Sequence, residues 1–334
     1  MPRQGRLHIP GAYYHVMGRG LERRLIFQNK SDKQDFLCRL ESGLNRTGSQ
    51  CIAWSIMPNH YHLLIRVGVV PLTQLMHSLL TGYATSYNSR YNRVGYVFQN
   101  RFKSILCDEE NYLMELVRYI HLNPVEAGLV KSINQLDTYP WTGHACIVKQ
   151  LFTTWQNISE VLGRFGSNNT RSVIRYKKFI KQGVGLDHES LFISGGLIRS
   201  YDGWEGIKMR RKDHEIRIGD EQILGDSSFA ANALRQDELA VKRKTQLYNA
   251  GWDIDKLIGY ICRELELDER LLFSKGRNNK ISYAKALVCY FAVRELGLST
   301  SAVAARLTIS QPAVSQSVKR GELLREKLRL DLDS

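Results

Sequence analysis

Two histidines, His60 and His62, stand two residues apart in an apolar stretch at residues 54–65. The stretch is too short to span a membrane and indicates two buried strands joined at residues 57–59. Successive strand side chains point to opposite faces, so His60 and His62 project side by side while Tyr61 and Leu63 point away. Neutral imidazoles bind divalent metal ions well. The pair predicts half of a metal site; the alternative is two hydrogen-bonded histidines in a core.

A tyrosine and an asparagine one helical turn apart supply a second candidate group. An apolar stripe at residues 113–120 predicts a helix with Asp108 as its N-cap and a stop at Pro124. Tyr119 lies on the flank of this stripe, and Asn123 lies on the same flank one turn later. This helix is therefore the candidate second half of the site. The alternative is a tyrosine that packs on an amphipathic helix beside an ordinary helix stop.

The elements that would position these residues follow a recognisable order. We expect strands at residues 12–19, 51–57, 60–67 and about 96–107, and helices from residues 29–32 to about 46 and from Pro71 onward. The order β-α-β-β-α-β followed by the Tyr119 helix predicts an α+β fold with a ferredoxin-like antiparallel sheet.

Composition restricts the class of protein. The 334 residues suffice for several domains, and the net charge is +14, with basic ends and a nearly neutral middle at residues 151–240. This distribution indicates nucleic-acid contacts at both ends. No run is apolar enough for a membrane helix or a signal peptide, and six scattered cysteines without a Cys-x-x-Cys pair fit a reducing cytoplasm. We therefore expect a cytoplasmic protein.

The last part of the chain predicts a helical DNA-binding domain. Residues 300–318 resemble a helix-turn-helix, with a turn at residues 308–310, Ser310 as the cap of the second helix and Pro312 in its first turn. A plain three-helix packing module is the alternative. The expected domains are residues 1–145, 146–240 (a connecting helical subdomain) and 241–334. The residues left to contact DNA are Gln311, Ser315, Gln316, Lys319 and Arg320.

Several motifs together resemble a known family. Residues 58–65 resemble the His-hydrophobic-His motif of HUH single-strand endonucleases, and residues 119–130 resemble the tyrosine helix of single-tyrosine, IS200-like transposases. Residues 14–20, 98–103 and 139–141 also resemble the branch called REP-associated tyrosine transposases, with weaker similarity at residues 194–198 and 223–225. Residues 250–322 resemble the C-terminal duplex-binding domain of the bacterial replication initiator, although its Asp-His-Ser-Thr signature is absent.

The resemblance implies an activity and assigns roles. Tyr119 matches the nucleophile, His60 and His62 match metal ligands for Mg²⁺ or Mn²⁺, and Asn123 falls where the family often has a glutamine ligand. The implied function is metal-dependent nicking and strand transfer of single-stranded, hairpin-forming repeat DNA through a 5′-phosphotyrosine. Duplex DNA is the expected partner of the C-terminal domain, and a monomer or weak dimer is expected. The N-terminal residues expected to contact DNA are Arg19, Arg101 and Lys103.

Two other functions remain open from the sequence. One is a non-catalytic, sequence-specific DNA-binding regulator, against which the set His60, His62 and Tyr119 speaks. The other is a rolling-circle or relaxase-type nickase. The absence of a helicase-like phosphate loop and the run at residues 123–125 favour the transposase. Residues 171–181 predict a basic amphipathic helix, which would either follow a phosphate backbone or be solvated.

Overall fold

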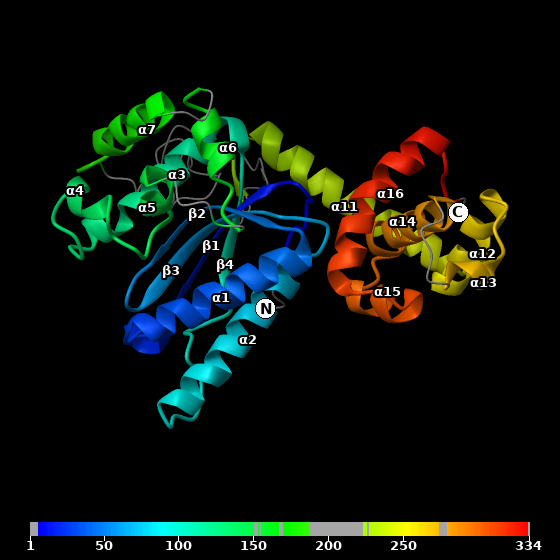
Figure 1. Cartoon of the computed structure of the whole chain (residues 1–334), viewed down its shortest axis with the longest axis horizontal. Helices are drawn as coiled ribbons and strands as arrows, with labels where there is room; N and C mark the ends of the chain where they lie inside the picture. Colours follow the sequence, from blue (N-terminus) through cyan, green and yellow to red (C-terminus); the bar gives the residue numbers. More distant parts are fainter. Residues whose placement is uncertain are drawn as a thin grey trace, which may run out of the picture.

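A computed structural model describes residues 6–149, 153, 155–166, 170–186, 223–225, 227–273 and 279–332. A sheet domain and a C-terminal helical domain lie side by side, and the long helix α11 (Ser227–Asn249) runs from one to the other (Figure 1). The family similarity at residues 194–198 lies outside the described residues. Among the described helices, none combines the length and the apolar character that crossing a membrane would need.

The sheet has the strand order expected of a ferredoxin-like fold. Its strands are β1 (Tyr13–Arg19), β2 (Gln50–Ile56), β3 (His60–Arg66), β4 (Lys103–Cys107) and β5 (Ile223–Leu224). They lie in the order β2-β3-β1-β4-β5, and the first four pair antiparallel. The predicted α+β fold is therefore confirmed. The short β5, parallel to β4, is an addition not predicted from the sequence.

Helices cover both faces of the sheet (Figure 1). One face packs against α1 (Lys30–Thr47) and α2 (Leu72–Arg90), and the other packs against α3 (Glu109–Glu126). Asn29 and Asp32 form a reciprocal capping box at the start of α1, which explains why the helix begins there. The short helices α4 (Ile133–Leu136), α5 (Gly143–Val148) and α6 (Ile158–Gly163) and the longer α7 (Thr170–Gln182) gather on the side of α3.

Within the sheet domain, the predicted start of one strand and the predicted end of one helix are wrong. β4 begins only at Lys103, because the preceding residues 96–102 follow an irregular path with a single bridge between Phe98 and Gly20. α3 does not stop at Pro124 but continues to Glu126. The fixed φ of proline suits a helix, and a proline in the last turn removes only one hydrogen bond, so the backbone of Ala127 still donates to Asn123.

The predicted connecting region is part of the sheet domain where it is described. Val173, Tyr176 and Ile180 of α7 are buried in the same core as α3, which confirms the amphipathic helix and leaves its basic residues outside. The expected boundary between residues 145 and 146 falls inside α5. The boundary expected between residues 240 and 241 falls inside α11, a helix that contributes Ala230 to the sheet-domain core and Leu247 to the C-terminal core.

The C-terminal domain consists of helices around one apolar core. Its helices are α12 (Ile254–Glu264), α13 (Glu269–Leu272), α14 (Asn279–Arg294), α15 (Thr300–Leu307) and α16 (Gln311–Leu328). The predicted turn between α15 and α16 is present: Thr308 ends α15 with a φ of 54°, in the left-handed region where glycine is common. Ser310 caps α16 by accepting a hydrogen bond from the backbone of Ala313. Val314 and Val318 are buried in the core, as expected.

Candidate active site

The central strands bring the candidate histidines onto one face of the sheet. β1 lies between β3 and β4, with Met17 opposite both His62 and Lys103, and with Arg19 opposite His60. Directly opposed residues share a face, so these side chains all lie under α3. Tyr61 is fully buried on the other face, as predicted. A Cβ at Gly18 would lie 2.5 Å from the Tyr61 hydroxyl, so the glycine leaves room for that ring.

The helix α3 places Tyr119 directly over the histidines. Asp108 caps its N-terminus by accepting from the backbone of Glu110, and the apolar side chains of the stripe hold the helix against the sheet. The Tyr119 ring centroid lies 5.4 Å from that of His62 and 5.8 Å from that of His15. Both pairs are nearly perpendicular. The sequence spacing predicts only that Tyr119 lies on a helix flank. The structure shows that this flank faces the His-x-His strand.

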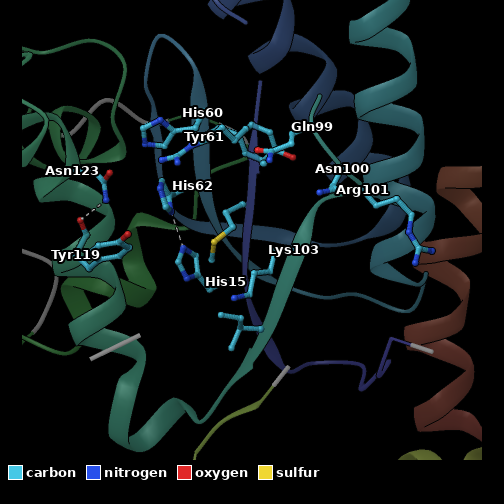
Figure 2. A pocket seen from close by; sticks show the side chains of 14 residues that line it. His15, His60, Tyr61, His62, Gln99, Asn100, Arg101, Lys103, Tyr119 and Asn123 are labelled. Carbon is cyan, nitrogen blue, oxygen red and sulfur yellow. Dashed lines mark hydrogen bonds between the residues drawn. The ribbon is translucent and has the colours of Figure 1, made fainter. Parts of the chain in front are cut away.

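A pocket of about 370 Å³ opens between α3 and the strand ends (Figure 2). It brings together every predicted site residue of the N-terminal domain: Tyr119, His60, His62, Asn123, Arg19, Arg101 and Lys103. The other lining residues are His15, Met17, Gly18, Tyr61, Gln99, Asn100 and Ile105. Three cationic residues line the same pocket as the imidazole pair, and such a lining suits a phosphate backbone.

Burial keeps the two candidate ligands neutral. Desolvation lowers the pKa of His60 to about 4, helped by the positive charge of Arg19 and opposed by a hydrogen bond with Asn123. Desolvation also holds the pKa of His62 well below its ordinary value, and His15, His60 and Arg19 add to the effect. Both imidazoles are therefore uncharged at neutral pH, which is the form that binds a metal ion.

Neighbouring groups determine which ring nitrogen is presented. The Nδ1 atom of His60 lies 2.6 Å from the Asn59 Oδ1, a carbonyl oxygen that can only accept. The Nδ1 atom of His62 lies 3.0 Å from the Nε2 of His15 (Figure 2). With both Nδ1 atoms engaged, Nε2 is the atom of each ring that can ligate, and a fixed partner on the second nitrogen is usual for metal-binding histidines.

Asn123 completes a donor set that fits a divalent metal ion. Its Nδ2 donates to the Tyr119 carbonyl at 3.4 Å, and its side chain also hydrogen-bonds His60. Within the described part of the chain, no cluster of three His, Cys, Asp or Glu side chains could hold a metal ion. The set present here has two imidazoles and one amide, which suits Mn²⁺ and leaves positions for the oxygen ligands that Mg²⁺ prefers.

Three polar residues of the pocket are not among those predicted from the sequence. His15 lies in the family-like run at residues 14–20, and the position of its strand next to the His-x-His strand is the signal that could indicate its contact with His62. Gln99 and Asn100 were placed in a strand, whereas they lie in the irregular segment before β4. An irregular segment has no periodic pattern, so the sequence does not predict that these side chains line the pocket.

Helix α16 lies apart from α3 (Figure 1), and none of its residues predicted to contact DNA lines this pocket. Gln316, Lys319 and Arg320 are exposed, and Arg320 hydrogen-bonds Ser282. Gln311 is half-buried. Ser315 is not available to DNA in this structure: it is only 3% exposed, and its hydroxyl donates to the carbonyl of Arg46 on α1 at 2.8 Å. The reason is a contact between domains that spacing within α16 cannot reveal.

Comparisons with known proteins give a family match for the N-terminal domain. Residues 8–123 match the family model described as "Transposase IS200 like". A solved structure described as "Structure of the REP associates tyrosine transposase bound to a REP hairpin" is similar with a TM-score of 0.37 and 17% identity, covering 46% of this chain and 89% of that one. Among curated proteins, none matches the chain. The family match confirms the resemblance predicted for the N-terminal domain.

Proposed function

We propose that this chain, whose residues 8–123 match the IS200-like transposase family, nicks single-stranded DNA and transfers strands with Tyr119 as nucleophile. The observation that carries the proposal is the position of the Tyr119 ring, 5.4 Å from His62 in a pocket lined by three cationic side chains. Transposases act on DNA, and this pocket is where the described residues combine a nucleophile with candidate metal ligands.

The step balances without ATP. The Tyr119 phenolic oxygen attacks the backbone phosphorus, and the bond from phosphorus to the 3′ oxygen of the preceding nucleotide breaks. The phenol loses its proton to solvent, and the departing 3′ oxygen takes one up. The products are a 5′-phosphotyrosine and a free 3′-hydroxyl. A second 3′-hydroxyl reverses the reaction at the same phosphorus and joins a different strand, because the energy of the phosphodiester is kept in the tyrosine linkage.

The chain's own residues prepare this step. His60, His62 and the amide of Asn123 would hold a Mg²⁺ or Mn²⁺ ion, which supplies Lewis-acid polarisation of a bound phosphate. Arg19, Arg101 and Lys103 hold the DNA backbone in the pocket and stabilise negative charge on its oxygens. The preferred substrate, from the resemblance to REP-associated transposases, is a hairpin-forming single strand.

The C-terminal domain would bind duplex DNA. The exposed Lys319 and Arg320 would contact phosphates, and Gln311 and Gln316 would reach base edges. We place the protein in the cytoplasm as a monomer or weak dimer. This division gives the sheet domain the chemistry and the helical domain a targeting role.

The test uses end-labelled single-stranded hairpins from the protein's own genomic neighbourhood, incubated with Mg²⁺ or Mn²⁺. Wild type should cleave them, and excess EDTA should stop cleavage. His60→Ala and His62→Ala should bind the hairpin but not cleave it, whereas His77→Ala, an exposed histidine of α2, should behave as wild type. Hairpin binding without cleavage by wild type would favour the non-catalytic regulator, and full cleavage in EDTA would exclude a metal-dependent step.

A further inference from the structure

The first turns of α16 rest on the C-terminal end of α1. The Ser315 hydroxyl donates to the Arg46 carbonyl at 2.8 Å. That carbonyl belongs to the last turn of α1, where a helix leaves its carbonyls without helical partners. A Cβ at Gly48, the residue that ends α1, would lie 3.8 Å from the Ser315 Cβ. A side chain of α16 thus contacts the backbone of α1 directly.

A second contact shows that the two domains are packed together. Val69 and Val70 follow β3 in the sheet domain, yet they are 3% and 2% exposed and belong to the apolar core of the C-terminal domain. His8 lies beside them, with a hydrogen bond to the Val69 backbone and the charge of Arg294 nearby. The sheet domain therefore contributes apolar side chains to the core of the helical domain.

The docked face includes the part of α16 that would read DNA. In a helix-turn-helix, the N-terminal residues of the second helix enter the major groove and contact base edges. Here Pro312 faces a groove against α1, whose other lining residues are Cys38, Glu41, Ser42, Asn45 and Arg46. Ser315 is buried, and its hydroxyl is bonded to α1. A duplex cannot occupy this space while α1 does, and Glu41 adds a carboxylate where phosphates would approach.

We propose that the C-terminal end of α1 is a docking surface for the recognition helix α16, and that α1 and duplex DNA compete for the same face of that helix. Binding of a duplex by the first turns of α16 releases the contact through Ser315 and draws the C-terminal domain away from Val69 and Val70. The inference rests on the proposed DNA-binding role of the C-terminal domain and does not depend on the Tyr119 chemistry.

An engineered disulfide can lock the docked state. The Cβ separation at Gly48 and Ser315 lies within the range of disulfides, roughly 3.5–4.5 Å. The double variant Gly48→Cys/Ser315→Cys is made in full-length protein with Cys38→Ser, which removes the exposed native thiol of α1. The duplex probe is the sequence enriched by the reduced double variant from a random duplex library. Each single-cysteine variant is the matched control.

The expected result is a cross-link that forms under mild oxidation only in the double variant. The cross-linked protein should bind the enriched duplex roughly tenfold or more weakly than the same protein after reduction. Only molecules in which α16 is released from α1 can bind the duplex, and the disulfide prevents this release. The single variants should bind equally in both conditions. Failure to cross-link, equal duplex affinity in both states, or enrichment of no duplex by the reduced protein would each overturn the inference.

A second variant covers the possibility that a cysteine at Gly48, whose φ is +66°, disturbs α1. Val69→Ser/Val70→Ser weakens docking from the sheet domain and substitutes no residue of the recognition helix α16 or of the catalytic pocket. It should bind the duplex more tightly than wild type, and unchanged affinity would contradict competition. Hairpin cleavage is measured in the same samples. Loss of cleavage with an intact duplex effect would reject the proposed Tyr119 chemistry and leave the docking inference standing.

Discussion

Replacing His15 tests whether a buried neighbour sets up His62 as a metal ligand. The Nε2 of His15 lies 3.0 Å from the Nδ1 of His62, and both rings are buried and nearly stacked. For His62 to bind a metal ion through Nε2, its Nδ1 must carry the proton and donate to His15. In His15→Leu the donor would lose its acceptor in a buried site, and the ring orientation would no longer be fixed.

The magnitude follows from this loss. Removing the partner of a buried polar group costs about 1–3 kcal/mol, and partners of metal-binding histidines typically account for roughly 10–100-fold in metal affinity. The fold should survive, because residue 15 lies opposite Leu64 and Ile105, and a leucine adds apolar contacts there. We expect His15→Leu to weaken Mn²⁺ binding by roughly 10–100-fold, which corresponds to about 1.4–2.8 kcal/mol.

The assay is Mn²⁺ titration of DNA-free protein, followed by electron paramagnetic resonance at neutral pH. His15→Gln offers an amide oxygen as acceptor and should retain most of the affinity. His77→Leu, on the exposed face of α2, is the matched control and should bind as wild type. Wild-type Mn²⁺ affinity in a folded His15→Leu variant would refute the reasoning, as would equal losses in His15→Leu and His15→Gln.

Three further outcomes are expected. Asn123→Ala should weaken Mn²⁺ binding in the same titration, while Asn123→Asp, which keeps an oxygen ligand, should restore it; equal affinity in all three proteins would remove Asn123 from the site. Tyr176→Phe should lower the free energy of unfolding in urea by about 1–3 kcal/mol, because the Tyr176 hydroxyl lies 2.8 Å from the Nδ1 atoms of both His121 and His144, two buried histidines. Tyr96→Phe, at an 83% exposed site, should change it little. Burial lowers the pKa of His15 to about 3 from an ordinary 6.5. Between these two pH values the unfolded chain binds a proton at His15 and the native state does not. Metal-free stability should be flat above pH 6.5 and fall by up to about 1.4 kcal/mol per unit for this group as pH drops toward 3; a rise in that window would contradict the burial argument.

The sequence predicted those parts of the site that depend on local periodicity. The two-residue repeat of a strand placed His60 and His62 on one face and Tyr61 on the other, and the structure has them so. The cap at Asp108 and the apolar stripe after it placed the Tyr119 helix. These features depend on neighbours within a few residues, which a single sequence displays directly.

Features that depend on distant partners could not be predicted in the same way. β5 is only two residues long and is a strand because it pairs with the edge of β4. Ser315 has the spacing of a DNA-reading residue, and only the arrangement of the two domains shows that α1 covers it. Pro124 is an ordinary helix stop by local rules, yet α3 continues through it for two residues.

The most direct test of the central claim is a covalent one. Wild type and Tyr119→Phe are incubated with end-labelled single-stranded hairpins and Mg²⁺ or Mn²⁺, resolved by denaturing electrophoresis, and any protein–DNA adduct is mapped to its peptide. Wild type should form an adduct at Tyr119. The phenylalanine variant keeps the ring against His15 and His62 but lacks the oxygen, so it should bind DNA and form none. An adduct on another tyrosine such as Tyr112, or one formed undiminished by Tyr119→Phe, would contradict the proposed mechanism.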